Sequence, residues 1–330
     1  MPELGSISHD SAATKFLMPW LVGAFVLTVL PLVATILLSC MEWDGVDPVQ
    51  ARWVGFDHYQ HLMGIEHDQD HDSATRVNRY RDPLFYRSLY NSLFFAALAT
   101  PLSLLVSLLL ALMLNAPLRG IAVFRSLAYL PHVLGGVATI LIWSWVFNPT
   151  YGPINQTIEW AYGVLDPVVR FFGGEGTGSW LLPGWLASET WCMPAVVCMH
   201  AWTAGGAVFI FLAALQRVDP DSQAAALIDG ANRWRRFRLI VLPQLTPAIL
   251  FNLITGFAAS MQSFNYAYLL YNRAQNDGLL FVVLYIYRCA FEPPYRVGYA
   301  SAMACILFVI LLVLSSLTFI TSKWWVHYES

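Results

Sequence analysis

Long apolar runs alternate with shorter polar segments along most of this chain of 330 residues. A membrane-spanning helix needs roughly 20 apolar residues, at about 1.5 Å rise each, to cross a hydrocarbon core of about 30 Å. Six runs meet that requirement, and none has Asp, Glu, Lys or Arg in its middle. The pattern therefore predicts an all-α membrane protein with six transmembrane helices. The predicted spans are about residues 16–40, 92–116, 127–147, 191–215, 246–271 and 297–321.

The composition supports the same class of protein. Hydrophobic residues make up 57% of the chain and charged residues 12%, which is too apolar for a soluble domain and too long for a single span. No nucleic-acid partner is expected. The cysteines lie in or next to the predicted spans without the spacing of metal ligands, so we interpret them as small packing residues. They are Cys40, Cys192, Cys198, Cys289 and Cys305.

Basic residues near the span ends predict the orientation in the membrane. If both termini are cytoplasmic, the inner and outer segments carry equal numbers of Lys and Arg, but the inner segments have about half the total length and hence about twice the basic density. We therefore expect residues 1–15 and 323–330 to be cytoplasmic and the chain to lie in the cell inner membrane. A lipoprotein cleavage site before Cys40 is disfavoured because the preceding apolar run is long for a signal-peptide core.

A polar, basic segment, residues 216–245, separates the fourth and fifth runs. Residues 221–228 predict a short helix, and Asp229-Gly230 predicts its end because glycine tolerates the left-handed conformation that terminates helices. Residues 231–240 predict a second helix before Pro243. The segment is therefore expected to form a helix-turn-helix at the membrane surface.

This segment resembles the cytoplasmic coupling loop of permease subunits of binding-protein-dependent ABC sugar importers, the maltose and glycerol-phosphate permease-like family. That signature runs Glu-Ala-Ala, then a Gly three residues on, and later Ile-x-Leu-Pro; Ala224 stands here in place of its Glu. The matching residues are Ala225, Ala226, Asp229, Gly230, Ile240, Leu242 and Pro243. Further matches, such as Gly55, Tyr59, Asn91 and Asn155, extend the resemblance over about residues 16–328.

The resemblance implies a transmembrane domain, residues 16–322, that works with other subunits. These are a second permease subunit, ATP-binding cassette subunits and an extracytoplasmic solute-binding protein. The chain has no Gly-x-x-x-x-Gly-Lys-[Ser/Thr] phosphate loop, so ATP is expected to be used by a partner, and no enzymatic activity or bound cofactor is expected of this chain. The residues implied in coupling are Asp221, Ala224, Ala225, Ala226, Asp229, Gly230, Arg235 and Pro243.

Two features of the coupling segment have alternative interpretations. Its arginines are expected to contact the ATPase, anionic membrane lipid, or both. The absence of the family's Glu at Ala224 means that Asp221 substitutes for it, that the ATPase surface differs, or that this subunit couples weakly.

The resemblance also places the solute path in the third, fourth and fifth spans. Hydroxyl and amide groups beside aromatic residues can hydrogen-bond and stack on sugars, although Ser and Thr in spans also bond neighbouring helices, and Ala commonly packs. The path candidates are Thr139, Ala204, Ala207, Ser260, Gln262 and Ser263.

Other functions find less support. An ion-coupled secondary transporter usually carries ionisable residues inside its bundle, and His132 and His200 are the only titratable candidates in the spans. A membrane enzyme that transfers sugars would need a carboxylate or nucleophile motif, which is not found. A non-transporting scaffold remains compatible with Ala224. No metal site is predicted, because the outer-loop histidines have zinc-ligand chemistry without the spacing of a closed site. They are His58, His61, His67 and His71.

Overall fold

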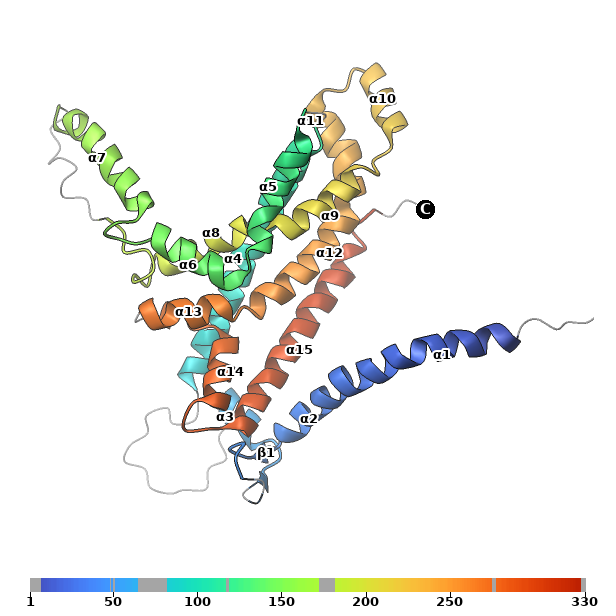
Figure 1. Ribbon diagram of the computed structural model, residues 1–330, viewed down its shortest axis with the longest axis vertical. Coiled ribbons are helices and arrows are strands. Elements are labelled where there is room, and N and C mark those ends of the chain that lie inside the picture. Colours follow the sequence, from blue (N-terminus) through green and yellow to red (C-terminus); the bar gives the residue numbers. More distant parts are fainter. Residues whose placement is uncertain are drawn as a thin grey trace, which may run out of the picture. The chain divides into compact units, whose positions relative to one another are not determined.

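The computed structural model describes residues 7–47, 49, 51–64, 82–116, 119–171, 182–274 and 277–327. The chain divides into two units. Figure 1 shows their helices and strands, coloured along the sequence. The first comprises Met1–Pro83 and Ile286–Val309, and the second comprises Leu84–Tyr285 and Ile310–Ser330.

The first unit begins with a long apolar helix. It comprises α1 (Ile7–Ala24), a π-helical turn and α2 (Leu30–Leu38), and the segment Phe16–Leu38 is apolar enough to span a membrane. None of that stretch is buried against the described residues, as expected for a helix that faces lipid. The first predicted span is therefore confirmed as an apolar helix of spanning length.

A short segment with two strands and a helix follows. Strand β1 (Met41–Glu42) pairs antiparallel with β2 (Arg52–Trp53), a small departure from the all-α prediction. Helix α3 (Asp57–Met63) then ends at Gly64, which has a positive φ. A two-stranded antiparallel sheet and a short helix therefore lie where the sequence predicted only a loop.

The second unit is built around α4 (Pro83–Leu114), α9 (Gly205–Leu215) and α12 (Leu242–Met261). Buried side chains from all three helices, including Ala111, Phe211 and Leu245, form one hydrophobic core. Helices α4 and α12 approach closely, because a Cβ added at Gly256 would lie 2.9 Å from Thr100 Cγ2. Small residues at helix contacts are the usual means of tight packing in a membrane, where lipid removes the hydrophobic drive between helices.

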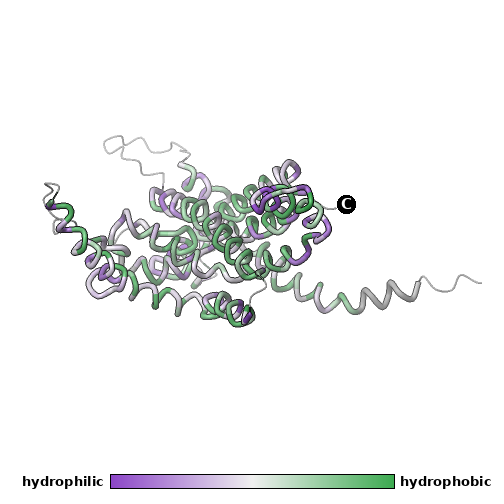
Figure 2. The backbone as a smooth tube through the Cα atoms, turned by 90° about the horizontal axis from the view of Figure 1, so that it is seen from above, coloured by the Kyte–Doolittle hydropathy of each residue, from purple (hydrophilic) through white to green (hydrophobic). Residues whose placement is uncertain are grey.

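Within the described ranges, four helical segments are long and apolar enough to cross a membrane, and the number rises to six if each of two bent helix pairs forms one span. Figure 2 shows that hydrophobic residues dominate the long helices. The long segments are Phe16–Leu38, Pro83–Leu114, Arg233–Tyr271 and Val297–Ser322. The segment Val297–Ser322 is α15, and Arg233–Tyr271 includes α11 (Arg233–Arg236), α12 and most of α13 (Asn265–Ala274). The other helices are α5 (Ile121–Val133), α6 (Gly136–Val146), α7 (Pro153–Phe171), α8 (Cys192–Trp202), α10 (Pro220–Ile228) and α14 (Val282–Phe291).

Three of the predicted spans are interrupted in the structure and not formed by one regular helix. The run 127–147 is two helices, α5 and α6, at 94°, and the run 191–215 is α8 and α9 at 46°. The run 246–271 leaves regular helix at 262–264 before α13 begins. At the sharpest break Gly135 has φ +76° and ψ 148°, a conformation that a residue with a Cβ rarely adopts.

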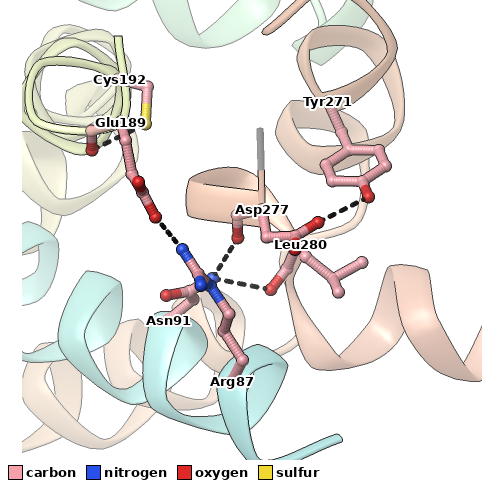
Figure 3. A network of polar contacts seen from close by, with 7 residues as sticks. All are labelled: Arg87, Asn91, Glu189, Cys192, Tyr271, Asp277 and Leu280. Carbon is pink, nitrogen blue, oxygen red and sulfur yellow. Dashed lines mark hydrogen bonds and ion pairs between the residues drawn. The ribbon is translucent and has the colours of Figure 1, made fainter. Parts of the chain in front are cut away.

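A polar network ties together segments at one end of α4 (Figure 3). The amide of buried Asn91 donates to the carbonyl oxygens of Asp277 (2.7 Å) and Leu280 (3.2 Å). One turn earlier, Arg87 forms an ion pair with Glu189, which precedes α8. Asn91 therefore satisfies two carbonyls of the turn between α13 and α14 and holds that turn against α4.

Candidate functional site

The polar segment between α9 and α12 contains α10 at one extremity of the second unit (Figure 1). Helix α10 begins at a capping residue. The Asp219 carboxylate accepts the backbone N–H groups of Asp221 and Ser222, both at 3.0 Å, and the Ser222 hydroxyl donates to it. These hydrogen bonds, the one from the Ser222 hydroxyl first, lower the pKa of Asp219 below its ordinary value. Pro220 occupies the first helical position, where its missing N–H costs nothing. The Asp-Pro pair is a sequence signal for this start that the motif comparison did not use.

Helix α10 ends in a complete Schellman turn. Gly230 has φ +73°, its N–H donates to the Leu227 carbonyl (3.1 Å), and the N–H of Ala231 donates to the Ala226 carbonyl (2.9 Å). These two bonds satisfy carbonyls that the helix end leaves without partners. The predicted helix end at Asp229-Gly230 is confirmed.

The second helix starts at another cap that sequence reasoning missed. The Asn232 side chain accepts the backbone N–H of Arg235 at 2.8 Å and begins α11. Asparagine is among the preferred capping residues, so the signal was present in the sequence.

This second helix does not end before Pro243, so that part of the prediction is wrong. Helix α11 continues through a π-helical turn, Phe237–Val241, into α12 without interruption. Pro243, which has no backbone N–H to donate, lies at the second position of α12, directly after the wider turn. The loop is thus joined to the core by one continuous helix.

Between its two fixed ends, α10 is uncovered. None of its nine residues is buried against the described part of the chain. Ile228 is 87% exposed and Leu227 60% exposed, while Ala224 and Ala225 are also exposed. A helix with fixed ends and apolar side chains in the open can seat in the groove of a partner. The other coupling candidates Asp221, Asp229 and Arg235 are exposed, and Ala226 is half-buried.

A second candidate region lies where the three interrupted spans meet. A Cβ added at Gly206, at the start of α9, would lie 3.0 Å from the ring of His132, so the break after α5 adjoins the break before α9. A Cβ added at Gly136 would lie 3.0 Å from Nδ2 of Asn265, which follows the break of the fifth span. We refer to residues 133–136, 203–205 and 262–265 as the break zone. Helix breaks expose backbone polar groups, which in a membrane are tolerated only where protein buries them or water reaches them.

The structure places four of the six path candidates at or next to the break zone. Thr139 lies one turn into α6 and is 1% exposed, yet its hydroxyl oxygen has no hydrogen-bond partner among the described residues. Ala204 is buried, and its carbonyl accepts from Ser107 Oγ (3.0 Å). Gln262, exposed, and Ser263, half-buried, lie at the break of the fifth span.

The other two path candidates have different surroundings. The Ser260 hydroxyl oxygen lies 3.1 Å from Thr100 Oγ1 and bonds α12 to α4. Ala207 packs against the hydrophobic core of the second unit. These two residues have the packing and interhelical roles that the sequence left open as alternatives.

The two histidines in the spans lie against a backbone carbonyl and against aromatic rings, respectively. His132 Nδ1 lies 3.4 Å from the Thr203 carbonyl oxygen, and the ring of His200 lies against those of Phe95 and Tyr266. Within the part of the chain that the structure describes, neither histidine pairs with a carboxylate, the partner that a proton relay usually uses.

The outer-loop histidines are only partly within the described residues. His58 and His61 flank the ring of Tyr299, with ring centroids 5.8 and 5.7 Å away. The described ranges contain no cluster of three or more His, Cys, Asp or Glu residues arranged to hold a metal ion. His67 and His71 lie outside the described residues.

Comparison with known proteins gives one family and relatives of similar length. Residues 78–325 match the family described as the binding-protein-dependent transport system inner membrane component. YesP of Bacillus subtilis, described as a probable ABC transporter permease protein, is 30% identical over 334 residues, covering 100% of this chain and 96% of YesP. LacF of Rhizobium radiobacter, a lactose transport system permease protein, is 31% identical over 258 residues, covering 76% of this chain and 80% of LacF.

A solved structure shares the fold. A chain from the crystal structure of a bacterial ABC transporter involved in the import of the acidic polysaccharide alginate aligns with a TM-score of 0.72. The alignment covers 96% of each chain at 22% sequence identity.

Proposed function

Because this chain belongs to the family of binding-protein-dependent transport system inner membrane components, we propose that it is the permease subunit that forms part of a carbohydrate path through the membrane. Its transport is driven by ATP hydrolysis in a separate subunit that seats on α10. A second permease subunit completes the path, and an extracytoplasmic solute-binding protein delivers the solute.

The observation that carries this proposal is that α10 is exposed while both of its ends are fixed. Its start is fixed by Asp219, its end by the turn at Gly230, and its apolar residues Leu227 and Ile228 are not covered by any described part of the chain. Both helices that bear it, α9 and α12, contribute buried side chains to the same core. A force applied to α10 by a partner is therefore transmitted to the spans through packed helices that resist compression.

The break zone supports a path for a polar solute. In secondary transporters the solute commonly binds at discontinuous helices, where unwound backbone groups take the place of water around the solute. The buried Thr139 hydroxyl next to the zone has no partner in the described chain, although buried polar atoms are usually hydrogen-bonded. We assign this hydroxyl a contact with a hydroxyl-rich solute during transport.

A carbohydrate is the solute class most consistent with the relatives. LacF is described as part of a lactose transport system. The break zone also brings the Gln262 amide and the Ser263 hydroxyl to one interrupted helix, which suits a neutral ligand rich in hydroxyl groups.

The direct test is uptake by proteoliposomes that contain this chain and the ATPase and permease subunits with which it co-purifies. Labelled oligosaccharide should accumulate only with ATP and a loaded solute-binding protein. Thr139→Val removes the hydroxyl at nearly constant volume, and loss of one neutral hydrogen bond, about 0.5–1.5 kcal/mol, should raise the KM for uptake by about 2- to 10-fold. Thr139→Ser, which keeps the hydroxyl, should retain most of the wild-type KM. Uptake without any ATPase, or an unchanged KM in Thr139→Val, would contradict the corresponding part of the proposal.

The orientation needs its own experiment. We propose six spans with both termini cytoplasmic, counting each bent pair as one span. In a variant without native cysteines, a membrane-impermeant thiol reagent added outside should label Val49→Cys in the outer segment but not Arg235→Cys in α11. Labelling of Arg235→Cys in sealed cells would reverse the orientation and remove α10 from the ATPase side.

A further inference from the structure

A cavity of about 470 Å³ lies in the second unit where the polar loop joins the core. One wall is apolar and comes from both helices that bear the loop, with Ala213 and Ala214 on α9 and Pro247 and Ala248 on α12. The buried face of the same two helices forms the hydrophobic core, so the cavity lies on the flank of their contact.

The rim of the cavity is polar and basic. Arg217 follows the end of α9, Gln244 lies in the first turn of α12, and His327 comes from the C-terminal segment. Among the described residues, no Asp or Glu lines the cavity. Within the described residues Arg217 has no ion pair, so its charge is available to a ligand. The site thus combines a guanidinium and an amide at its mouth with an apolar wall behind them.

The C-terminal segment is held in place at this rim. The backbone N–H of His327 donates to Thr246 Oγ1 at 2.9 Å, and that hydroxyl donates to the Pro243 carbonyl at 2.6 Å. Trp324 and Trp325 come just before, and tryptophan is enriched at the interface between hydrocarbon and water. The cavity therefore lies at the depth where lipid headgroups meet the ends of the spans.

We propose that this cavity binds the headgroup of an acidic phospholipid from the cytoplasmic leaflet. Arg217 pairs with the phosphate, Gln244 donates to a headgroup oxygen, and the acyl chains lie along the apolar wall. Basic pockets between helices on the cytoplasmic side are sites of this kind. The assignment to this leaflet rests on the proposed orientation.

The bound lipid would contact both ends of the loop that contains α10. Arg217 precedes α10 in the sequence and Gln244 follows it, so one headgroup contacts both ends of the same loop. Retention of the lipid should therefore favour one position of α10, and ATP-dependent uptake should depend on acidic lipid more steeply in the wild type than in a variant that cannot bind it.

The test uses the full-length chain, purified and examined by native mass spectrometry with phosphatidylglycerol and phosphatidylcholine. The wild type should retain phosphatidylglycerol selectively. Arg217→Gln should weaken that retention about fivefold, the effect expected for one basic residue at an anionic surface, whereas Arg217→Lys should largely preserve it. Lys323→Gln removes a nearby basic residue that does not line the cavity and serves as the matched control.

Other occupants give different outcomes. Equal loss of phosphatidylglycerol in Arg217→Gln and Lys323→Gln, or no loss in either, would overturn the site. Retention of inorganic phosphate by the lipid-free protein to the same extent as phosphatidylglycerol would show a free-anion site and overturn the lipid assignment. Selective retention together with outside labelling of Arg235→Cys would leave the lipid site standing and reject the proposed orientation, so the two failures can be told apart.

Discussion

The turn at Gly230 is the feature of the loop whose disruption is easiest to quantify. In Gly230→Val the new side chain must adopt φ near +73°, or the turn must change. A Cβ added at this position meets nothing within 4 Å, so no clash adds to the conformational cost. The left-handed conformation costs a residue with a side chain about 1–2 kcal/mol, and a β-branched residue lies at the upper end of that range.

That cost is local, because it affects the two hydrogen bonds that end α10 and none of the core packing. It corresponds to a roughly 5- to 30-fold loss in the population of the native turn. We expect Gly230→Val to insert and purify as the wild type does, with unchanged thermal stability of the spans. ATP-dependent uptake and stimulated ATP hydrolysis in the reconstituted complex should fall, because α10 no longer keeps its place.

The matched control is Gly230→Asn, since asparagine tolerates the left-handed region and should retain most of the activity. Two results would refute the reasoning. Wild-type uptake in Gly230→Val would mean that the turn does not position α10 for coupling. Equal loss in the Val and Asn variants would mean that the effect comes from a side chain at a contact surface and not from backbone conformation.

Three further perturbations test the cap, the interface and the network around α4. The hydrogen bonds that lower the pKa of Asp219 stabilise the start of α10. This contribution is fully present at pH values above the ordinary aspartate pKa of about 3.9, and it is lost as the pH falls through the lower pKa of the folded state. Hydrogen exchange of the first α10 amides should accelerate in that acid range, whereas Asp219→Asn should show no such pH dependence. Ala224→Glu should either strengthen ATPase stimulation, if the partner offers a basic residue, or weaken co-purification by burying an unpaired charge. Asn91→Asp points an acceptor at two carbonyls and should destabilise the fold by about 1–3 kcal/mol in thermal unfolding.

Controls are available for the last two. Gln223→Glu adds the same charge one residue earlier on α10, and a change in both variants would indicate a general charge effect. Unchanged co-purification and ATPase rate in Ala224→Glu would show that position 224 does not face the partner. Asn115→Asp makes the same chemical change at an exposed position and should leave the melting temperature unaltered. A melting temperature for Asn91→Asp equal to that of this control would remove Asn91 from the network.

The sequence by itself determined the features that depend on local chemistry. Apolar run length predicted where the long helices lie, because only a continuous apolar helix suits a hydrocarbon solvent. The end of α10 at Gly230 followed from the conformational freedom of glycine, and the motif around it identified the family. The start of α10 at Asp219 and the cap at Asn232 were also readable from residue type, although the motif comparison passed over them.

The tertiary structure decided what depends on contacts between distant segments. Hydropathy could not show that the runs 127–147 and 191–215 are each broken, because the segments on both sides of Gly135 and of Thr203 are apolar. The continuation of the helix past Pro243 depended on a π-helical turn that no residue pattern predicted. Among the path candidates, residue type alone treated Thr139 and Ser260 alike. Packing separated them, since Ser260 meets Thr100 from a helix far away in sequence while the Thr139 hydroxyl meets no described partner.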